Sequence, residues 1–171
     1  MSMEQPFITS VTYSTSDSRI TLFGIPDQIG AAALIFQALA DNKINIDMIM
    51  QNEPVAALGR AEISLTMPRD ELKTAKNALQ PLEGKAYTDA VFSEAMGKVS
   101  LIGAGLRSHP EVSAKVFSVL AEEKINMDMI STSPIQVGCV IPSEDVPRAV
   151  KALSEAFGLD PDEAQEENPF R

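Results

Sequence analysis

The sequence has 171 residues, 44% of them apolar, and its formal net charge at pH 7 is -10. This length is enough to bury the core of one domain or of two small domains. A negative chain without a local cluster of lysine or arginine is unsuited to binding nucleic acid or an anionic membrane surface. We therefore expect no nucleic-acid partner and no membrane partner.

Two further features narrow the class of protein. The N-terminus lacks the charged and apolar regions of a signal peptide, and no apolar run reaches the ~18 residues of a membrane span. Cys139 is the single cysteine and lies in an apolar run, so we expect a buried small hydrophobe rather than a reactive thiol. A cytoplasmic location is the default expectation.

The first half of the chain shows the periodicities of alternating strands and helices. The expected elements are a strand at 19–24, a helix at 29–41, strands at 44–50 and 60–67, a helix at 68–79 and a strand at 86–93. This order is that of a ferredoxin-like βαββαβ unit, whose sheet is antiparallel with both helices on one face.

The second half repeats the first. The run FQALADNKINIDMI at 36–49 returns as FSVLAEEKINMDMI at 117–130, a spacing too long for a solenoid and typical of a duplicated small domain. A capping box of Ser108 and Glu111 predicts the start of the first helix in this copy. The expected elements are a strand at 98–103, a helix at 108–123, strands at 125–131 and 135–141, and a helix at 143–157.

The second copy lacks a closing strand, because the tail at 159–171 is acidic, nearly free of apolar residues and expected to be disordered. A surplus strand is predicted at 7–13. We infer that it completes the second sheet, which makes the fold α+β with one domain inserted into the other. The expected domains are 18–94, and 1–17 with 95–158. The alternative is that 7–13 lies at the edge of the first sheet.

Residues suited to catalysis, metal binding or cofactor binding are sparse. His109 has no second histidine or cysteine to form a metal site or a proton relay, and we expect it at the start of a helix. Residues 103–105 (GAG) follow a strand, as in a dinucleotide-binding loop, but Ser108 stands at the third glycine position, which favours a simple turn. We expect no catalytic residue, no metal and no cofactor.

The loop at 24–32 (GIPDQIGAA) is more informative. Asp27 precedes a helix start, and the small residues at 30–32 would let a ligand approach the backbone. A helix N-terminus favours a carboxylate, and Asp27 can hold an ammonium group, so the loop suits a zwitterion. The alternative is that Asp27 is an ordinary N-cap and the alanines are close packing. Residues 51–52 (QN) likewise either contact a ligand or cap a turn.

Five separated motifs resemble the regulatory part of bacterial aspartate kinase. They are 24–32 (GIPDQIGAA), 44–52 (INIDMIMQN), 97–105 (GKVSLIGAG), 108–112 (SHPEV) and 129–133 (MISTS). The motifs occur in the order of that family and span nearly the whole chain. The sequence is most similar to the short β subunit of the heteromeric α2β2 enzymes, which consists of two ACT domains, one inserted in the other, without the kinase domain.

The resemblance implies a regulatory subunit that is not itself an enzyme. Such subunits bind threonine and in some members lysine between ACT domains and restrain the catalytic α subunit, which gives feedback inhibition of the aspartate pathway of amino-acid biosynthesis. We expect a homodimer, because the binding site needs a first domain facing a second domain. The effector-binding residues carried over by position are Asp27, Gly30, Ala32 and Gln51 from the first domain, Asn126 and Met127 from the facing second domain, and Ser64, Ser113 and Ser133 in the inhibitor pockets.

The sequence departs from the family pattern at three places. Ile29 stands where the loop before the first helix has a proline, Pro54 replaces a small polar residue, and residues 134–136 read PIQ in place of Glu-Ile-Arg. These differences leave the identity of a second effector open. Two alternative functions also remain: a freestanding ACT-domain amino-acid sensor, and the C-terminal regulatory part of a full-length aspartate kinase.

Overall fold

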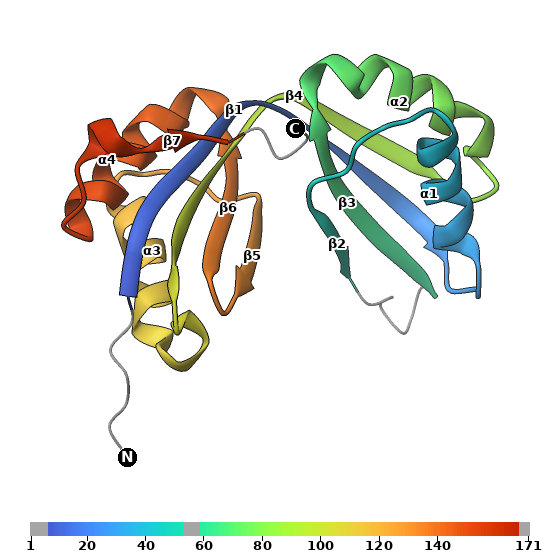
Figure 1. Ribbon diagram of the computed structural model, residues 1–171. Coiled ribbons are helices and arrows are strands. Elements are labelled where there is room, and N and C mark those ends of the chain that lie inside the picture. Colours follow the sequence, from blue (N-terminus) through green and yellow to red (C-terminus); the bar gives the residue numbers. More distant parts are fainter. Residues whose placement is uncertain (1–6, 53–58, 168–171) are drawn as a thin grey trace. The chain divides into compact units, whose positions relative to one another are not determined.

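The structure, a computed structural model, describes residues 7–52 and 59–167. It divides into two compact units: residues 17–94 form one, here called the inserted unit, and residues 7–16 with 95–167 form the other, here called the split unit. Pro54, residues 1–6 of the expected split domain and residues 168–171 of the expected tail lie outside the described residues. Figure 1 labels the elements of both units.

Two long strands run from one unit into the other. β1 spans Phe7–Pro26 and β4 spans Asp89–Ala104, and the two are hydrogen-bonded neighbours. The prediction of two separate strands in place of each one is wrong. The polar run at 14–18 contains no glycine or proline that would end β1, so the strand continues through it.

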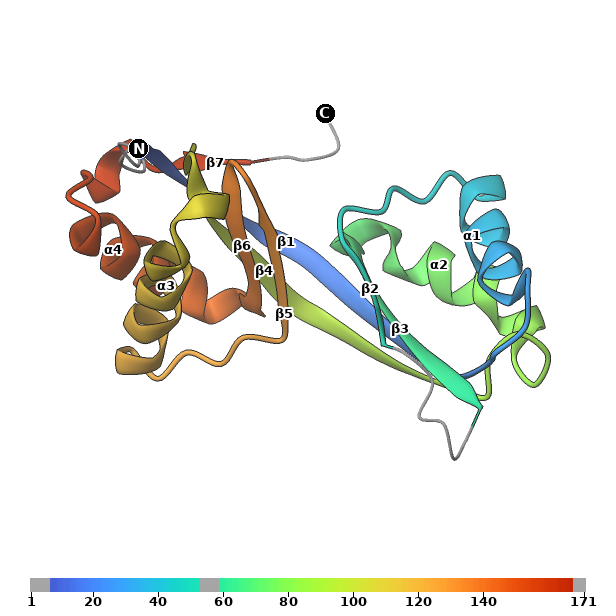
Figure 2. The ribbon, with the colours of Figure 1, turned by 90° about the horizontal axis from the view of Figure 1, so that it is seen from below.

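The inserted unit has the strand order β2-β3-β1-β4, in which β2 is Ile49–Asn52 and β3 is Arg60–Pro68. β3 pairs antiparallel with both neighbours. The helices α1 (Ala31–Asp41) and α2 (Leu72–Leu79) lie on one face of this sheet (Figures 1 and 2). Their apolar faces bury alternate residues of β1 and β3 in a core that includes Ile20, Leu22, Ile63 and Leu65.

The split unit has the same plan with the order β1-β4-β6-β5, in which β5 is Met129–Ser133 and β6 is Gln136–Pro142. β6 pairs antiparallel with both β4 and β5. The helices α3 (Pro110–Glu122) and α4 (Val146–Ala156) cover one face (Figure 2). The predicted α+β fold of two ferredoxin-like units is therefore confirmed.

The internal repeat extends to an unusual backbone conformation. Lys43 and Lys124 follow α1 and α3, and both have φ of 57°, a left-handed conformation that glycine usually adopts at helix ends. In each copy the next residue returns its N–H to the helix: Ile44 to the Leu39 carbonyl at 3.0 Å and Ile125 to the Leu120 carbonyl at 2.9 Å. The two copies therefore end their first helix in the same way.

Several boundaries differ from the sequence prediction. α3 begins at Pro110, and Ser108 lies in a preceding 3-10 turn at Leu106–Ser108, so the predicted capping box is wrong. Pro110 has no N–H and suits the first helical position, which moves the N-cap to His109. α2 and α4 likewise begin after single 3-10 turns, at Arg69–Glu71 and Ser143–Asp145.

The second strand of each unit also begins later than expected. β2 starts at Ile49 and β5 at Met129, because residues 44–48 and 125–128 carry the chain from the helix end back to the sheet. Ile44 and Ile125 are buried in this crossing segment. Their apolar side chains produced the strand prediction although they pack beneath the helices rather than in the ladder.

The tail differs from the expected disordered segment where the structure describes it. A 3-10 turn at Pro161–Glu163 leads to β7 (Gln165–Glu166), which pairs parallel with β1 at Thr12 and Tyr13. Leu159 and Ala164 pack against the core of the split unit. The packing of Leu159 and Ala164 and the pairing with the edge of β1 therefore order this segment. Its acidic composition alone had indicated disorder.

Candidate effector site

The loop before α1 is fixed by its backbone. Asp27 donates its N–H to the Gly59 carbonyl at 3.1 Å, and Gln28 donates to the Pro26 carbonyl at 2.8 Å. The N-cap of α1 is Gly30, with φ of 92°, and no side chain caps the helix. The interpretation of Asp27 as an ordinary N-cap is therefore wrong. Its carboxylate is exposed and does not cap the start of α1.

Small residues leave the start of α1 open. A Cβ atom placed on Gly30 would meet nothing within 4 Å, while Ala32 is half-buried against the core of the inserted unit. The Ala31 N–H already donates to the Gln28 carbonyl at 3.2 Å, so a ligand at Gly30 would meet the N–H groups that follow it at the start of α1. Those N–H groups and the helix dipole favour a negatively charged group at this place.

Gln51 and Ser64 lie on neighbouring strands but on opposite faces of the inserted sheet. Gln51 is opposite Ile63, whose side chain belongs to the core beneath the helices. Ser64 is opposite Met50 and Thr21 on the other face, since successive residues of a strand alternate in direction. The Ser64 hydroxyl forms a hydrogen bond of 2.9 Å with the Thr21 hydroxyl. The structure thus groups Asp27, Gly30 and Ala32, and separates Ser64 from them.

In the split unit, Asn126 and Met127 lie in the segment that joins α3 to β5. Asn126 is exposed, whereas Met127 is half-buried and packs against the core. The neighbouring Asp128 donates its N–H to the Val140 carbonyl at 2.8 Å, which holds the segment against β6. The side chain of Asn126 is therefore presented on a fixed backbone.

The start of α3 carries a pocket of about 590 Å³ that brings Ser113 and Ser133 together. The other lining residues are Leu106, Arg107, Pro110, Thr132, Pro134 and Val137. In the repeat, this place corresponds to the start of α1. Arg107 and Thr132 were not among the predicted site residues, although Arg107 lies between two of the quoted motifs and Thr132 lies within a third. Arg107 adds an exposed cation and Thr132 a hydroxyl to the pocket wall.

His109 has a structural role at the start of α3, as predicted. Its side chain is buried, and its Nδ1 lies 2.7 Å from Oε1 of Glu111. Two hydrogen bonds lower the pKa of the Glu111 carboxyl. The larger effect comes from the Glu111 backbone N–H and the smaller from the His109 side chain. Gly105, with φ of 72°, forms the turn between β4 and the 3-10 turn, in an antiparallel sheet that does not form a dinucleotide-binding unit.

Other kinds of site find no support in the described ranges 7–52 and 59–167. Within them, no three His, Cys, Asp or Glu side chains gather to hold a metal ion, and no helix has the length and apolar character needed to cross a membrane. Burial raises the pKa of the Cys139 thiol to about 12, which keeps it protonated and poorly nucleophilic. The expectation of a buried, inert cysteine is confirmed.

Comparison with known proteins identifies the family. The sequence model described as "ACT domain" matches residues 11–81 and 99–157, one match in each copy of the repeat. This chain belongs to the ACT-domain family. The two matches follow the internal duplication, with the first in the N-terminal copy and the second in the C-terminal copy.

Solved structures of regulatory subunits of aspartate kinase are similar to the chain over most of its length. The regulatory subunit of aspartate kinase from Thermus flavus is 38% identical with a TM-score of 0.82, over 88% of this chain and 99% of that chain. A structure of aspartokinase alpha and beta subunits is 37% identical with a TM-score of 0.81, over 89% of this chain and 99% of the matched chain.

The curated relatives are longer. The aspartokinase of Mycolicibacterium smegmatis is 41% identical over 162 residues, which is 94% of this chain and 38% of the relative. This ACT-domain chain therefore spans about 38% of the length of such relatives. Its near-complete overlap is with regulatory subunits, and the predicted resemblance to them is confirmed.

Proposed function

We propose that this ACT-domain chain is the non-catalytic β subunit of an aspartate kinase and that it binds threonine as a feedback inhibitor. The observation that carries the proposal is the overlap with 99% of a regulatory subunit at 38% identity. The loop that precedes α1 supports it, because the carboxylate of Asp27 is exposed and not used as a helix cap.

The site that we propose uses the two charges of a free amino acid. The first N–H groups of α1, next to Gly30 and Ala32, bind the effector carboxylate. Asp27 binds its ammonium group through a charge-assisted hydrogen bond. Gln51, at the end of β2, hydrogen-bonds to the threonine hydroxyl, which distinguishes threonine from apolar amino acids of similar size.

The second wall of this site comes from another copy of the chain. Asn126 and Met127 of the facing copy close over the effector, so the protein is a homodimer in which each site needs both copies. The exposed amide of Asn126 supplies polar contacts, and Met127 supplies an adaptable apolar contact. Effector binding and dimerisation are then linked by a coupling free energy. The effector changes the affinity of the two copies for each other by the same factor by which dimerisation changes the affinity for the effector.

The pocket at the start of α3 is the place that we propose for a second effector, such as lysine. Ser113 and Ser133 line it, and Ser64 is the polar residue carried over for the inserted unit. Arg107 at the pocket wall suits a carboxylate. Residues 134–136 depart from the family pattern, and Pro134 lies in the wall of this pocket.

The partner of the homodimer is the catalytic α subunit, in an α2β2 assembly located in the cytoplasm. The similarity to the structure of aspartokinase alpha and beta subunits supports this partner, because the chain covers 99% of the matched subunit. A freestanding sensor and a separately expressed part of a longer kinase remain as alternatives. They differ from the proposal in whether a catalytic subunit binds in trans.

Calorimetric titration of the purified chain with threonine and then lysine tests the proposal, with molecular mass followed by light scattering in each state. Saturable threonine binding linked to a change in mass is expected. A folded chain that binds neither amino acid, with or without the catalytic subunit, would refute effector binding. Threonine binding without any association with a catalytic subunit would favour the freestanding sensor.

A further inference from the structure

The segment after α4 lies along the N-terminal half of β1 in the split unit (Figure 1). Residues 159–167, here called the C-terminal strap, pair with β1 through Thr12–Gln165 and Tyr13–Glu166. Glu167 adds a hydrogen bond from its N–H to the Tyr13 carbonyl at 2.7 Å. Because β4 occupies the other side of β1, the strap covers what would otherwise be a free edge of this sheet.

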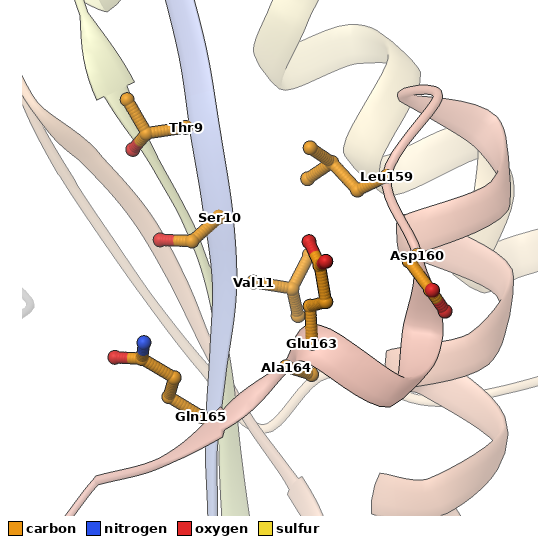
Figure 3. A pocket seen from close by; sticks show the side chains of 8 residues that line it. All are labelled: Thr9, Ser10, Val11, Leu159, Asp160, Glu163, Ala164 and Gln165. Carbon is orange, nitrogen blue, oxygen red and sulfur yellow. The ribbon is translucent and has the colours of Figure 1, made fainter.

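The hold of the strap on β1 is partial. Between Thr9, Ser10 and Val11 of β1 and the turn of the strap lies a pocket of about 370 Å³. Figure 3 shows Leu159 and Asp160 on the far side of this pocket from the strand, and the side chain of Glu163 nearer to it. Close pairing is limited to residues 12 and 13, so a short ladder, together with the contacts of Leu159 and Ala164 to the core, keeps the strap in place.

The covered edge is unusual in its charge. Residues 7–16 (FITSVTYSTS) contain no charged residue, no glycine and no proline. Sheet edges normally carry such residues, because they prevent pairing with another chain. The strap supplies the missing charge with five carboxylates: Asp160, Asp162, Glu163, Glu166 and Glu167.

The inserted unit provides an internal comparison. Its corresponding edge is β4 at 89–94, where no strand within the described residues pairs on the side away from β1. That segment (DAVFSE) carries Asp89 and Glu94 in its own sequence. The edge without a strap is therefore charged, and the edge that the strap partly covers is not.

We propose that the C-terminal strap guards the β1 edge, and that this edge is a docking surface for residues 7–16 of a second copy of the chain. Two identical strands can pair antiparallel about a two-fold axis, with each backbone donor opposite an acceptor. No like charges oppose one another in that pairing, whereas two straps bring ten carboxylates together, twice the five in each copy. The strap thus blocks the docking strand both by occupation and by repulsion.

A variant that ends at Gly158 tests the proposal directly. We expect its mass by light scattering to rise with concentration to at least about twice that of the full chain under the same conditions. Adding Ser10→Lys to the shortened variant places a charge in the edge and returns the mass to that of the full chain. Ser118→Lys, which adds the same charge on the exposed side of α3, leaves the self-association unchanged.

A second variant covers the case in which the shortened chain does not fold. Glu167→Pro in the full chain removes the N–H that donates to Tyr13 and leaves the packing of Leu159 and Ala164 intact. We expect a smaller rise in mass, again reversed by Ser10→Lys. Masses equal to that of the full chain at every concentration, or self-association that Ser10→Lys does not reduce, would overturn the proposal.

Discussion

The backbone N–H of Asp27 donates a hydrogen bond to the carbonyl oxygen of Gly59 over a distance of 3.1 Å. This bond holds the loop before α1 against the start of β3 without involving the side chain. The carboxylate of Asp27 is exposed, and the helix cap is provided by Gly30. The charge at this position can therefore be removed while the loop keeps its conformation.

The first prediction concerns Asp27→Asn. Loss of a charge-assisted hydrogen bond to the effector ammonium weakens threonine binding by about 10- to 100-fold. Stability changes by less than about 0.5 kcal/mol, as for other exposed positions. Asp41→Asn at the opposite end of α1, where the amide can still accept from Gln37, serves as the control. Equal affinities for the two variants by calorimetry would show that Asp27 does not contact the effector.

The sequence was sufficient to predict the fold class because the repeat shows each unit twice. The strand at 60–67 was predicted from its alternation, and β3 covers it. The continuity of β1 and β4 was missed, because a polar run can be either a linker or a strand and only pairing partners decide between them. β7 was missed for the same reason: it exists through one short parallel pairing with β1.

Part of the candidate site could also be predicted from sequence. The loop at Asp27, Gly30 and Ala32 is continuous in the chain, so its residues lie together in the structure. Ser113 and Ser133 lie on different elements, and it is the folding of β5 and β6 against α3 that puts both on one pocket. The alternation within 60–67 puts Ser64 on the face away from the helices, but no local pattern indicated its hydrogen bond to Thr21.

The second prediction concerns the pocket at the start of α3. Ser113→Leu fills part of its volume of about 590 Å³ and blocks binding of the second effector, while threonine binding at the Asp27 loop keeps its affinity within about twofold. Ser118→Leu, on an exposed position of the same helix, is the matched control. Calorimetric titrations with lysine and with threonine measure the two sites separately. If the Ser113 variant, but not the Ser118 variant, lost binding of both amino acids, the two sites would not be independent.

The third prediction concerns close packing in the split unit. A Cβ atom at Gly97 would lie 2.5 Å from Cγ2 of Val146 and 2.6 Å from the Ser14 carbonyl oxygen. Gly97→Ala should therefore lower the free energy of unfolding by about 1–3 kcal/mol, since the backbone of β1 cannot move aside freely.

Gly138→Ala is the control for Gly97→Ala. Its nearest neighbour would be the Ser100 hydroxyl at 3.2 Å, which can rotate, so the expected loss is below about 1 kcal/mol. Urea unfolding of both variants measures the difference. A Gly97 variant as stable as the wild type would show that β1 and β4 pack less closely than described.

The fourth prediction concerns pH. Burial raises the pKa of the Cys139 thiol from 9.0 to about 12. Because the unfolded chain loses this proton first, the contribution to stability is complete below pH 9.0 and is lost as the pH rises towards 12. Between pH ~8 and pH ~10.5, the free energy of unfolding should fall by about 2 kcal/mol more in the wild type than in Cys139→Ala.

The comparison with Cys139→Ala cancels other groups that titrate in the same range, such as Tyr87, whose pKa is raised by burial and by Glu83. Urea unfolding at pH ~8 and pH ~10.5 gives the four free energies that the comparison needs. Parallel losses of stability in the two proteins would show that the Cys139 thiol is not shielded from water in the folded chain.

Reconstitution with the catalytic α subunit of an aspartate kinase is the decisive measurement for feedback inhibition by this chain. Aspartate phosphorylation is measured with and without this chain, across a range of threonine concentrations, and with the Asp27→Asn variant in parallel. We expect threonine to inhibit the enzyme only when this chain is present, and Asp27→Asn to shift inhibition to about 10- to 100-fold higher threonine. Identical threonine responses with and without the chain would contradict it.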